Sequence, residues 1–412
     1  MPNESKSSAL SDRIRQNGIP LDQKKIEWKE YKLGEIAEIV GGGTPSTSNE
    51  DYWDGDIPWL SPKDLTGYNR VYIEKGARNI TKEGLRKSSS KLMPAGTVLF
   101  SSRAPIGYVA IAKNEICTNQ GFKSLVCNPN KLWNVFAYYW LKANTEYLQS
   151  LGTGTTFAEI SGAVMKSISI SIPPLSEQKR IASILSSLDD KIDLLHRENA
   201  TLEAMAETLF RHLFIENPNP DWKEGVIADV IDFNPPRKLG KGEVAPFLEM
   251  SNLSTDVYAP IAWRDRAFSS GTKFINGDTL LARITPCLEN GKAAYIDFLD
   301  STQVGWGSTE YIVMRPKRKI HPFFAYIVAK YQDFRDYAES CMSGSSGRQR
   351  VDVDNLKTYR FCIPDAIAIE QFNKNIVFLV GKMANNNNGI RCLKSLSNAL
   401  LPRLMSNMSL SL

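Results

Sequence analysis

The stretch IPPLSEQKRI, residues 172–181, joins a strand-like segment to a long helix. Pro173 and Pro174 lack the backbone N–H groups that a continuing strand needs, and Ser176 suits the N-cap of a helix. Glu177 then lies in the first turn, where a negative charge interacts favourably with the helix dipole. We therefore expect a helix to begin at this point.

Apolar residues after this start recur at alternating steps of four and three, which is the spacing of a coiled-coil seam. The seam comprises Ile181, Leu185, Leu188, Ile192, Leu195, Asn199, Leu202, Ala206, Leu209 and Leu213. The sequence NPNP, residues 217–220, is expected to end the helix, because proline cannot continue it.

A second helix with the same spacing is predicted near the C-terminus. Its seam comprises Phe372, Ile376, Leu379, Met383, Asn386, Ile390, Leu393, Ser397, Leu400 and Leu404. Two features oppose this helix: the sequence NNNNG, residues 385–389, favours a turn, and Pro402 is expected to end or bend the helix near Leu401. The seam spacing continues across the asparagine run, so a continuous helix is favoured over a hairpin there.

Burial of both seams is simplest if the two helices pack against each other. Asn199 and Asn386 then lie inside the seam, where a polar residue fixes the helix register at some cost in stability. An intramolecular core is therefore preferred over a zipper that binds a partner.

Outside the helices the sequence occurs twice, with a period of about 190 residues. Each copy is rich in short β-branched segments bounded by glycine and proline. Matching landmarks return in the same order: WKE at residues 28–30 and 222–224, PWLS at 58–61 and PFLEMS at 246–251, FAY at 136–138 and 324–326, glycine-rich turns at 152–155 and 344–347, and EQ at 177–178 and 370–371. The chain is therefore predicted to hold two similar strand-rich domains, each followed by a long helix.

The composition fits an ordinary globular protein with a net charge of +5, which is compatible with nucleic-acid binding without requiring it. The six cysteines form no C-x-x-C pair and none of the three histidines is near two cysteines, which argues against a zinc site and a disulfide framework. The N-terminus lacks the apolar core of a signal peptide, and no run of about eighteen apolar residues occurs. We therefore expect a cytoplasmic protein without membrane contact.

Two sequences resemble catalytic motifs without meeting their chemical requirements. NPPR, residues 234–237, resembles the N-P-P-aromatic loop of adenine methyltransferases, but Arg237 replaces the aromatic residue that stacks on a flipped base. GGG, residues 41–43, is not followed by the lysine and helix start of a phosphate-binding loop, so a flexible turn is predicted. No catalytic residue and no metal ligand are therefore predicted in this chain.

The order of a strand-rich domain, the sequence IPPLSEQKRI, a long helix, a second domain and a second helix resembles the specificity subunit of type I restriction–modification enzymes. The resemblance covers residues 28–404 and is most evident at residues 28–39 and 172–181. It implies an α+β fold with two similar strand-rich target-recognition domains, joined by two long helices that form an antiparallel coiled coil. The implied boundaries are 1–26 for an N-terminal arm, 27–174 and 217–364 for the recognition domains, 175–216 and 365–405 for the spacer helices, and 406–412 for a tail.

The resemblance also implies a function and partners. Each domain is expected to read one half of a bipartite, asymmetric target in double-stranded DNA. The expected partners are two adenine-methyltransferase subunits and two ATP-dependent restriction subunits, which would hold S-adenosylmethionine, ATP and Mg²⁺, while this chain holds no cofactor. The alternatives are a self-contained DNA methyltransferase or nuclease with DNA-reading repeats, and a purely structural coiled-coil scaffold.

Readout of bases requires directional donors and acceptors on loops that a rigid scaffold holds. The loops that match between the two copies carry such side chains. The candidates in the first domain are Ser61, Lys63, Arg103, Asn119, Gln120, Thr155 and Thr156, and those in the second are Asn252, Arg283, Ser308, Thr309, Ser345, Ser346, Arg348 and Arg350. Phosphate contact is the commoner role for such residues, so no single one is assigned to a base.

Overall fold

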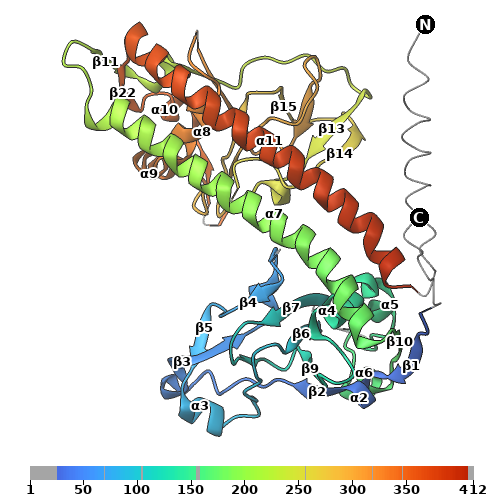
Figure 1. Ribbon diagram of the computed structural model, residues 1–412. Helices are drawn as coiled ribbons and strands as arrows, with labels where there is room; N and C mark the ends of the chain where they lie inside the picture. The colour runs from blue at the N-terminus through green and yellow to red at the C-terminus, as the bar shows by residue number, and fades with distance from the viewer. Residues whose placement is uncertain are drawn as a thin grey trace, which may run out of the picture. The chain divides into compact units, whose positions relative to one another are not determined.

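A computed structural model of the chain describes residues 26–68, 70–103, 105–154, 158–255, 257–317, 319–345 and 347–406 (Figure 1). The chain divides into two compact units. Unit 1 comprises Met1–Lys191 and Leu393–Leu412, and unit 2 comprises Ile192–Cys392. The boundary falls inside both long helices, so each unit contains one strand-rich domain and a part of each helix.

Unit 1 contains a main sheet, a small sheet and a two-stranded ribbon. The main sheet has the order β2 (Ala37–Gly41), β9 (Lys123–Cys127), β6 (Val98–Ser102), β7 (Ile106–Ala112) and β4 (Tyr72–Ile73). The small sheet has the order β5 (Arg78–Ile80), β3 (Trp53–Leu60) and β8 (Cys117–Thr118), and the ribbon pairs β1 (Lys29–Lys32) with β10 (Ser169–Ile172). The shorter helices are α2 (Leu33–Ile36), α3 (Lys82–Arg86), α4 (Asn134–Ala143), α5 (Thr145–Ser150) and α6 (Gly162–Ser167), with 3₁₀ turns η1 (Glu50–Tyr52) and η2 (Pro62–Leu65).

Unit 2 contains the same parts and one more ribbon. Its main sheet has the order β12 (Ile231–Phe233), β19 (Tyr311–Pro316), β16 (Thr279–Ala282) and β17 (Ala293–Tyr295). Its small sheet has the order β14 (Arg264–Ala267), β13 (Val244–Leu248), β18 (Gly305–Gly307) and β15 (Thr272–Phe274). The ribbons are β11 (Lys223–Val226) with β22 (Arg360–Ile363) and β20 (Met342–Ser343) with β21 (Arg350–Val351); the helical segments are η4 (Ile227–Asp229), η5 (Met250–Asn252), α8 (Phe323–Lys330), α9 (Gln332–Ser340) and α10 (Val353–Leu356).

The two units have similar topologies, which confirms the two similar strand-rich domains expected from the sequence repeat, although the main sheet has five strands in unit 1 and four in unit 2, and the small sheet has three and four. In each unit the first strand pairs with the last strand before the long helix. In each small sheet the central strand has an antiparallel neighbour and a parallel one. Trp59 lies opposite Arg78 and Cys117 there, and Phe247 occupies the same position opposite Arg264 and Trp306.

The two long helices are α7 (Leu175–Phe210), which continues into a π-helical turn η3 (Arg211–Glu216), and α11 (Ala366–Leu404). Helix α7 begins one residue before Ser176, because the Pro174 carbonyl already accepts from the backbone N–H groups of Glu177 and Gln178. The expected N-cap at Ser176 is therefore wrong, and the residue lies in the first turn. The acidic first turn is as predicted.

Helix α11 is continuous through residues 385–389, so the favoured interpretation of the asparagine run is confirmed. It also passes Pro402 and ends at Leu404, so the expected end near Leu401 is wrong. A proline this close to the end of a helix removes one backbone hydrogen bond. Burial of Leu404 and Met405 in the core of unit 1 offsets that loss.

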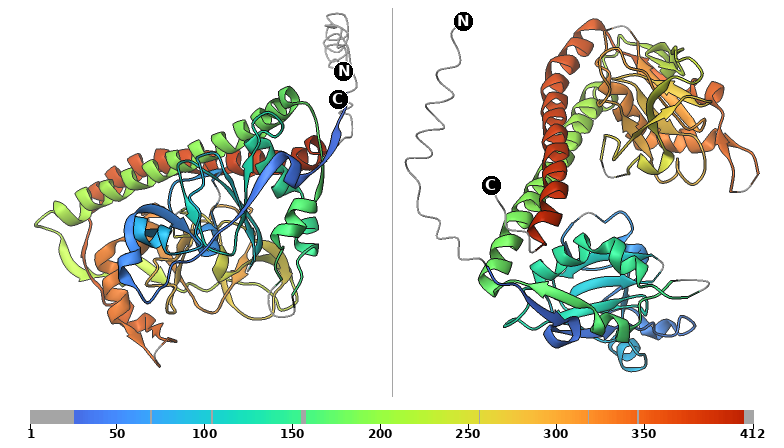
Figure 2. Two further views of the ribbon diagram at one scale, coloured as in Figure 1. Left: turned by 90° about the horizontal axis from the view of Figure 1, so that it is seen from below. Right: turned by 90° about the vertical axis from the view of Figure 1, so that its right-hand side faces the viewer.

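The long helices run antiparallel, as their contacts inside each unit demonstrate. In unit 1 the start of α7, at Ile181 and Leu185, shares a core with Leu404 at the end of α11. In unit 2 the end of α7, at Phe210, shares a core with Phe372 at the start of α11. Figure 2 shows the two helices side by side. The antiparallel coiled coil of the expected fold is therefore present.

Side chains at the predicted seam positions are all buried or partly buried. The buried ones are Ile181, Leu185, Ile192, Leu195, Asn199, Ala206, Phe372, Ile376, Met383, Asn386, Ile390 and Leu404, and the partly buried ones are Leu188, Leu202, Leu209, Leu213, Leu379, Leu393, Ser397 and Leu400. Near the end of α7 the deepest aromatic residues are Phe210 and Phe214, each one position beyond a predicted seam residue. The helix there packs against the strand-rich domain of unit 2 as well as against α11, which widens its apolar face.

A buried tyrosine fixes each strand-rich domain to α7. In unit 1 the Tyr139 hydroxyl on α4 donates to Asp189 Oδ2 at 2.8 Å. In unit 2 the Tyr326 hydroxyl on α8 donates to Glu203 Oε1 at 2.6 Å. Burial raises the pKa of Glu203 above its usual range, in spite of this hydrogen bond. Equivalent helices thus carry the contact that orients each domain on the spacer.

Candidate nucleic-acid interface

Three candidate loops of unit 1 are bonded to one another. The Asn119 backbone N–H donates to the Leu60 carbonyl at 2.8 Å, next to Ser61. The Gly121 carbonyl accepts from the Ser102 N–H at 2.8 Å, next to Arg103. The structure therefore brings together candidates that are far apart in the sequence.

The side chains on these loops differ in what they can offer a ligand. The Ser61 hydroxyl donates to Asp64 Oδ2 at 2.8 Å, and Asn119 Oδ1 accepts from the Gly121 N–H at 2.9 Å. The side chains of Ser61 and Asn119 therefore stabilise the turns in which they lie. Lys63 and Gln120 are exposed, and Gln120 Oε1 accepts from the Thr44 hydroxyl at 2.6 Å. Lys63 and Gln120 are therefore the side chains of these two loops that face solvent most fully.

Arg103 is part of a small charged cluster. Its Nη1 lies 3.6 Å from Glu159 Oε2, and Lys123 Nζ lies 3.1 Å from Glu159 Oε1. The Arg103 side chain is 37% exposed, so one side of the guanidinium still faces solvent. The single carboxylate neutralises only one of the two cations, which leaves the cluster net positive.

The triple glycine at residues 41–43 is a rigid packing element, and the expected flexible turn is wrong. The Gly43 N–H donates to the Thr118 carbonyl at 2.9 Å, and the Gly43 carbonyl accepts from Trp59 Nε1 at 2.9 Å. A Cβ on Gly42 would lie 2.1 Å from the Asn119 carbonyl oxygen. Glycine is required here because two loops approach its backbone too closely for any side chain.

The described residues on either side of the two glycine-rich segments are paired in a similar way in both units. In unit 1, Thr153 and Arg103 each form a β-bridge with Glu159. In unit 2, Arg350 pairs with Ser343 within the β20–β21 ribbon and forms a β-bridge with Ile284. Each pairing therefore lies beside the strand-end arginine of its domain. The candidates Thr155, Thr156 and Ser346 lie outside the described residues.

Two arginines proposed for DNA contact in unit 2 are engaged within the protein. Arg283 Nη2 donates to the Val351 carbonyl at 2.9 Å and so anchors the β20–β21 hairpin. Arg350 forms a bidentate ion pair with Glu310, with Nε and Nη2 to oxygen distances of 2.8–2.9 Å. A DNA contact by either residue would compete with these bonds. Sequence could not reveal this, because Val351 and Glu310 are far along the chain from the arginines that they bind.

The remaining candidates of unit 2 are more accessible. The Ser308 hydroxyl accepts from the Glu310 N–H at 3.1 Å and is partly buried. Thr309, Ser345 and Arg348 are exposed. Asn252 is partly buried in η5 and accepts a bond from the Ile261 N–H at 3.0 Å through its carbonyl. Exposed loop side chains of unit 2 are thus chemically different from Lys63 and Gln120 in unit 1.

Arg237, in the NPPR sequence, points into the protein. Its Nη2 lies 2.8 Å from Asp278 Oδ1, and Asp278 is fully buried. Asn234 has a positive φ of 51° and its Oδ1 accepts from the Val313 N–H at 2.9 Å. Both polar side chains of this sequence therefore hold the second domain together, and neither faces a ligand.

A chain of amide side chains connects the coiled coil to the strand-rich domain of unit 2. Asn386 Nδ2 donates to Asn199 Oδ1 at 2.9 Å, and Asn199 Nδ2 donates to Asn387 Oδ1 at 2.9 Å. Asn387 Nδ2 continues to the Tyr258 hydroxyl at 2.8 Å, which donates to Asp297 Oδ2 at 2.9 Å. Burial raises the pKa of Asp297 above its usual range. The asparagine run thus stays helical because its side chains have partners that a hairpin would lose.

Replacing Asn386 with alanine is expected to lower the free energy of unfolding of unit 2 by about 1–3 kcal/mol, because the buried Asn199 oxygen loses its donor. Exposed Asn385 in the same run is the matched control, and its replacement with alanine should cost nothing, since alanine is the better helix former. Urea unfolding of the full chain measures both variants. Equal stability of the two variants would show that the seam amides are not coupled.

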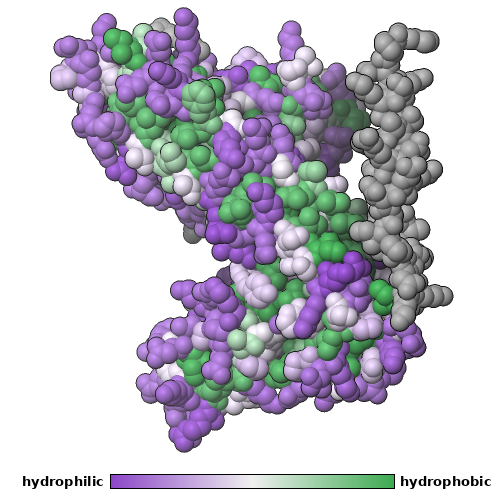
Figure 3. All heavy atoms as spheres, in the orientation of Figure 1, coloured by the Kyte–Doolittle hydropathy of each residue, from purple (hydrophilic) through white to green (hydrophobic). Residues whose placement is uncertain are grey.

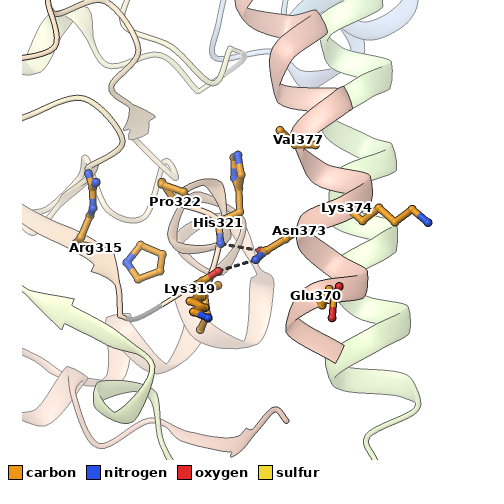
Figure 4. Close-up of a pocket in the computed structure, with 10 residues that line it drawn as sticks. Arg315, Lys319, His321, Pro322, Glu370, Asn373, Lys374 and Val377 are labelled. Carbon is orange, nitrogen blue, oxygen red and sulfur yellow. Dashed lines mark hydrogen bonds between the residues drawn. The ribbon is translucent and has the colours of Figure 1, made fainter. Parts of the chain in front are cut away.

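An open hollow of about 600 Å³ lies between α11 and the loop before α8 (Figure 4). Asn373 bridges its two sides: Asn373 Oδ1 accepts from the His321 N–H at 2.8 Å, and Asn373 Nδ2 donates to the Lys319 carbonyl at 2.6 Å. In unit 1 the same kind of bridge is made by Gln178, between Lys131 and Trp133. Gln371 matches Gln178 in the sequence repeat but does not make the equivalent contact in unit 2, where Gln371 is exposed.

No group of three or more His, Cys, Asp or Glu side chains in the described part of the chain is arranged to hold a metal ion. Of the helices formed by described residues, none is both long enough and apolar enough to cross a lipid bilayer. Several apolar side chains on α11 nevertheless face solvent, including Ile367 and Phe378. Figure 3 shows hydrophobic surface over the helix pair on the face seen there.

Comparisons with known proteins agree over most of the chain. A family model described as type I restriction modification DNA specificity domain matches residues 25–204. The specificity subunit of type I restriction enzyme MjaIX from Methanocaldococcus jannaschii is 30% identical over 411 residues, which cover 92% of this chain and 93% of that protein. The EcoR124I/EcoR124II specificity subunit from Escherichia coli is 30% identical over 218 residues, covering 49% of this chain and 51% of the relative. The crystal structure of a type I restriction–modification S subunit from M. genitalium has the same fold, with a TM-score of 0.54 at 17% identity, covering 95% of this chain and 99% of that one.

Proposed function

Because this chain belongs to the family of type I restriction–modification specificity subunits, we propose that it reads a bipartite, asymmetric DNA target and positions catalytic partner subunits on it. Each strand-rich domain would read one half of the target. The observation that carries the proposal is the pair of domains of similar topology whose equivalent loops present different side chains. Similar folds suit similar binding to the duplex, and different loop chemistry suits two different half-sites.

The partners proposed are two adenine-methyltransferase subunits and, in the full enzyme, two ATP-dependent restriction subunits. S-adenosylmethionine, ATP and Mg²⁺ would be bound by those subunits, and this chain would act without catalysis of its own. Exposed apolar side chains on the long helices, such as Ile367 and Phe378, support a docking role for the helix pair. The inward orientation of Arg237 speaks against a methyltransferase loop in this chain. Such a system would operate in the cytoplasm.

The proposal predicts methyl transfer to DNA only when the chain is mixed with the methyltransferase subunit of its own system and S-adenosylmethionine. The chain alone should give background transfer. Sequencing of the modified DNA should then reveal methylated adenines that flank a split target. Transfer by the chain alone would instead support a self-contained methyltransferase.

Variants of the full chain with substitutions in only one domain make this test more specific. Replacing Lys63 and Gln120 with alanine should relax or weaken recognition of one half-site, while replacing Thr309 and Arg348 should affect the other half-site only. Each mismatched base pair in such a target typically costs about 1–3 kcal/mol, so the change is measurable by comparing methylation of targets altered in one half. Equal effects of both double variants on both half-sites would contradict one domain reading each half.

A further inference from the structure

The small sheet of each unit carries an exposed arginine on its edge strand, at one equivalent position. Arg78 lies on β5, which is the edge of the small sheet in unit 1, and Arg264 lies on β14, which is the edge in unit 2. Arg78 is opposite Trp59 and Arg264 is opposite Phe247. All four side chains of β14 are exposed, which adds Arg266 to the same face two residues further on.

Aromatic rings hold these guanidinium groups in place. Arg78 Cζ lies 3.6 Å from the centroid of the Trp53 ring. Arg266 Cζ lies 4.8 Å from the Phe247 centroid and 5.6 Å from the Trp306 centroid, and Arg264 Cζ lies 5.9 Å from the Phe247 centroid. A guanidinium held over a ring keeps its N–H donors free at the edge of its plane, where a second ligand can bind.

The charge of these arginines is only partly neutralised within the protein. Arg264 forms an ion pair with Glu249. For Arg78 and Arg266 the described residues provide no ion-pair partner. A role limited to packing would not require a cation at both of these exposed positions, since uncharged side chains can cover a ring as well.

The stacked arginines lie beside turns that already carry candidate DNA contacts. The Ala77 N–H, next to Arg78, donates to Asp64 Oδ1 at 2.8 Å, and Asp64 follows Lys63. In unit 2, the Glu249 carbonyl accepts from the Asn252 N–H at 3.0 Å, while the Glu249 side chain pairs with Arg264. Each arginine strand is thus tied to the matched loop of its own unit.

We propose that Arg78 in unit 1 and Arg264 and Arg266 in unit 2 bind phosphates of the DNA backbone through guanidinium groups that aromatic rings pre-orient. This rests on the proposed recognition of DNA. The two domains would read different base sequences, whereas the phosphates are the same in every half-site. A cation kept at the same position in both domains therefore suits the part of the duplex that does not vary. An arginine edge also matches two phosphate oxygens at once.

The test uses the full chain and a fluorescein-labelled duplex of arbitrary sequence, because phosphate contacts are independent of sequence. Affinity is measured by fluorescence anisotropy between low and moderate KCl concentrations. The slope of log affinity against log salt should fall by about 0.9 for each phosphate contact removed. R78A removes one proposed phosphate contact and should therefore lower the slope by about 0.9. R264A/R266A removes two and should lower it by up to about 1.8. At 0.1 M salt each lost contact corresponds to binding weakened about eightfold.

Two sets of variants separate this role from others. R180A/R197A removes two arginines that pair with Glu177 and Asp193 on α7, so it changes the net charge as much as R264A/R266A does. This control should leave the slope unchanged. R78K and R264K/R266K keep the charge and should restore most of the slope. If an alanine variant does not fold, the glutamine variant at the same position keeps the long side chain over the ring and serves instead.

The outcomes distinguish this inference from the function on which it rests. An unchanged slope for R78A and R264A/R266A, with normal binding by the wild-type chain, would overturn the inference and leave the proposed function intact. An equal loss in R180A/R197A would also overturn it, since net charge would then suffice. A change in sequence preference without a change in slope would assign the arginines to bases and overturn the phosphate role. Absence of any duplex binding by the wild-type chain and of methylation in the mixture would overturn both.

Discussion

Replacing Asp278 with alanine is expected to lower the free energy of unfolding of unit 2 by about 3–5 kcal/mol, because it leaves two partly buried arginines without the buried carboxylate that they share. Asp278 is fully buried, and its Oδ1 lies 2.8 Å from Arg237 Nη2 and 3.2 Å from Arg315 Nη1. Its Oδ2 also accepts from the Ile275 N–H at 2.9 Å. Urea unfolding of the full chain gives the total loss, and hydrogen exchange of peptides from Ile192–Cys392 locates it.

A surface ion pair of the same unit is the control for this prediction. Asp354 is 88% exposed and pairs with Lys357 at 2.8 Å, so its replacement with alanine should change the free energy of unfolding little. Asp278→Asn keeps an oxygen for the Ile275 N–H while it removes the charge, and it should fall between the two. A loss for Asp278→Ala no larger than that for Asp354→Ala would mean that Arg237 is free of this structural role. The NPPR sequence would then merit a direct test for catalysis.

Replacing Phe210 with alanine is expected to destabilise unit 2 by about 3–5 kcal/mol, the usual cost of emptying the space of a buried phenylalanine. Phe210 is 1% exposed, and its ring centroid lies 5.4–6.4 Å from four other aromatic rings. Those rings belong to Phe214, Phe324, Tyr331 and Phe361, which come from η3, α8, the start of α9 and β22. The single side chain thus joins the end of α7 to three elements of the strand-rich domain.

Met205, one turn earlier on α7, provides the matched control. It is 52% exposed, so Met205→Ala should change the stability by no more than about 0.5 kcal/mol. Hydrogen exchange should rise in α8 and β22 for Phe210→Ala and stay unchanged in unit 1. A loss spread evenly over both units would contradict the assignment of Phe210 to the core of unit 2 alone.

The helices could be predicted because their apolar residues recur at regular spacing. The two domains could be predicted because their landmark sequences occur twice in the same order. A seam that recurs every three or four residues requires only the geometry of a helix, so Ile181 to Leu202 and Ile376 to Leu400 could be recognised without any knowledge of their partners. The order of landmarks in the two copies likewise predicted two similar strand-rich domains. At the end of α7 the regular spacing predicted burial of Leu209, whereas the more deeply buried residue is Phe210. The helix packs there against two surfaces, so its buried residues do not form a single row.

The candidate interface was predictable only at the level of loops. Sequence matching selected loops that lie together in the fold, since Asn119, Ser61 and Arg103 are neighbours in unit 1. It could not tell Lys63 and Gln120, which face solvent, from Ser61 and Asn119, which hold turns. It also missed Arg78 and Arg266, because their stacking partners Trp53 and Trp306 lie on other strands and leave no local pattern.

Sequence alone was enough to predict the elements of this protein: two similar strand-rich domains, two long helices, and the polar residues Asn199 and Asn386 in the seam between them. These features depend on spacing along the chain, which local geometry converts directly into structure. Only the tertiary structure shows which polar side chains are bonded within the protein and which remain available to bind a ligand. Arg237, Arg283 and Arg350 are bonded to Asp278, Val351 and Glu310 because folding brings those partners within hydrogen-bonding distance from remote parts of the chain. Such bonds form only where folding brings the two groups together, and no local sequence pattern records where such a partner will lie.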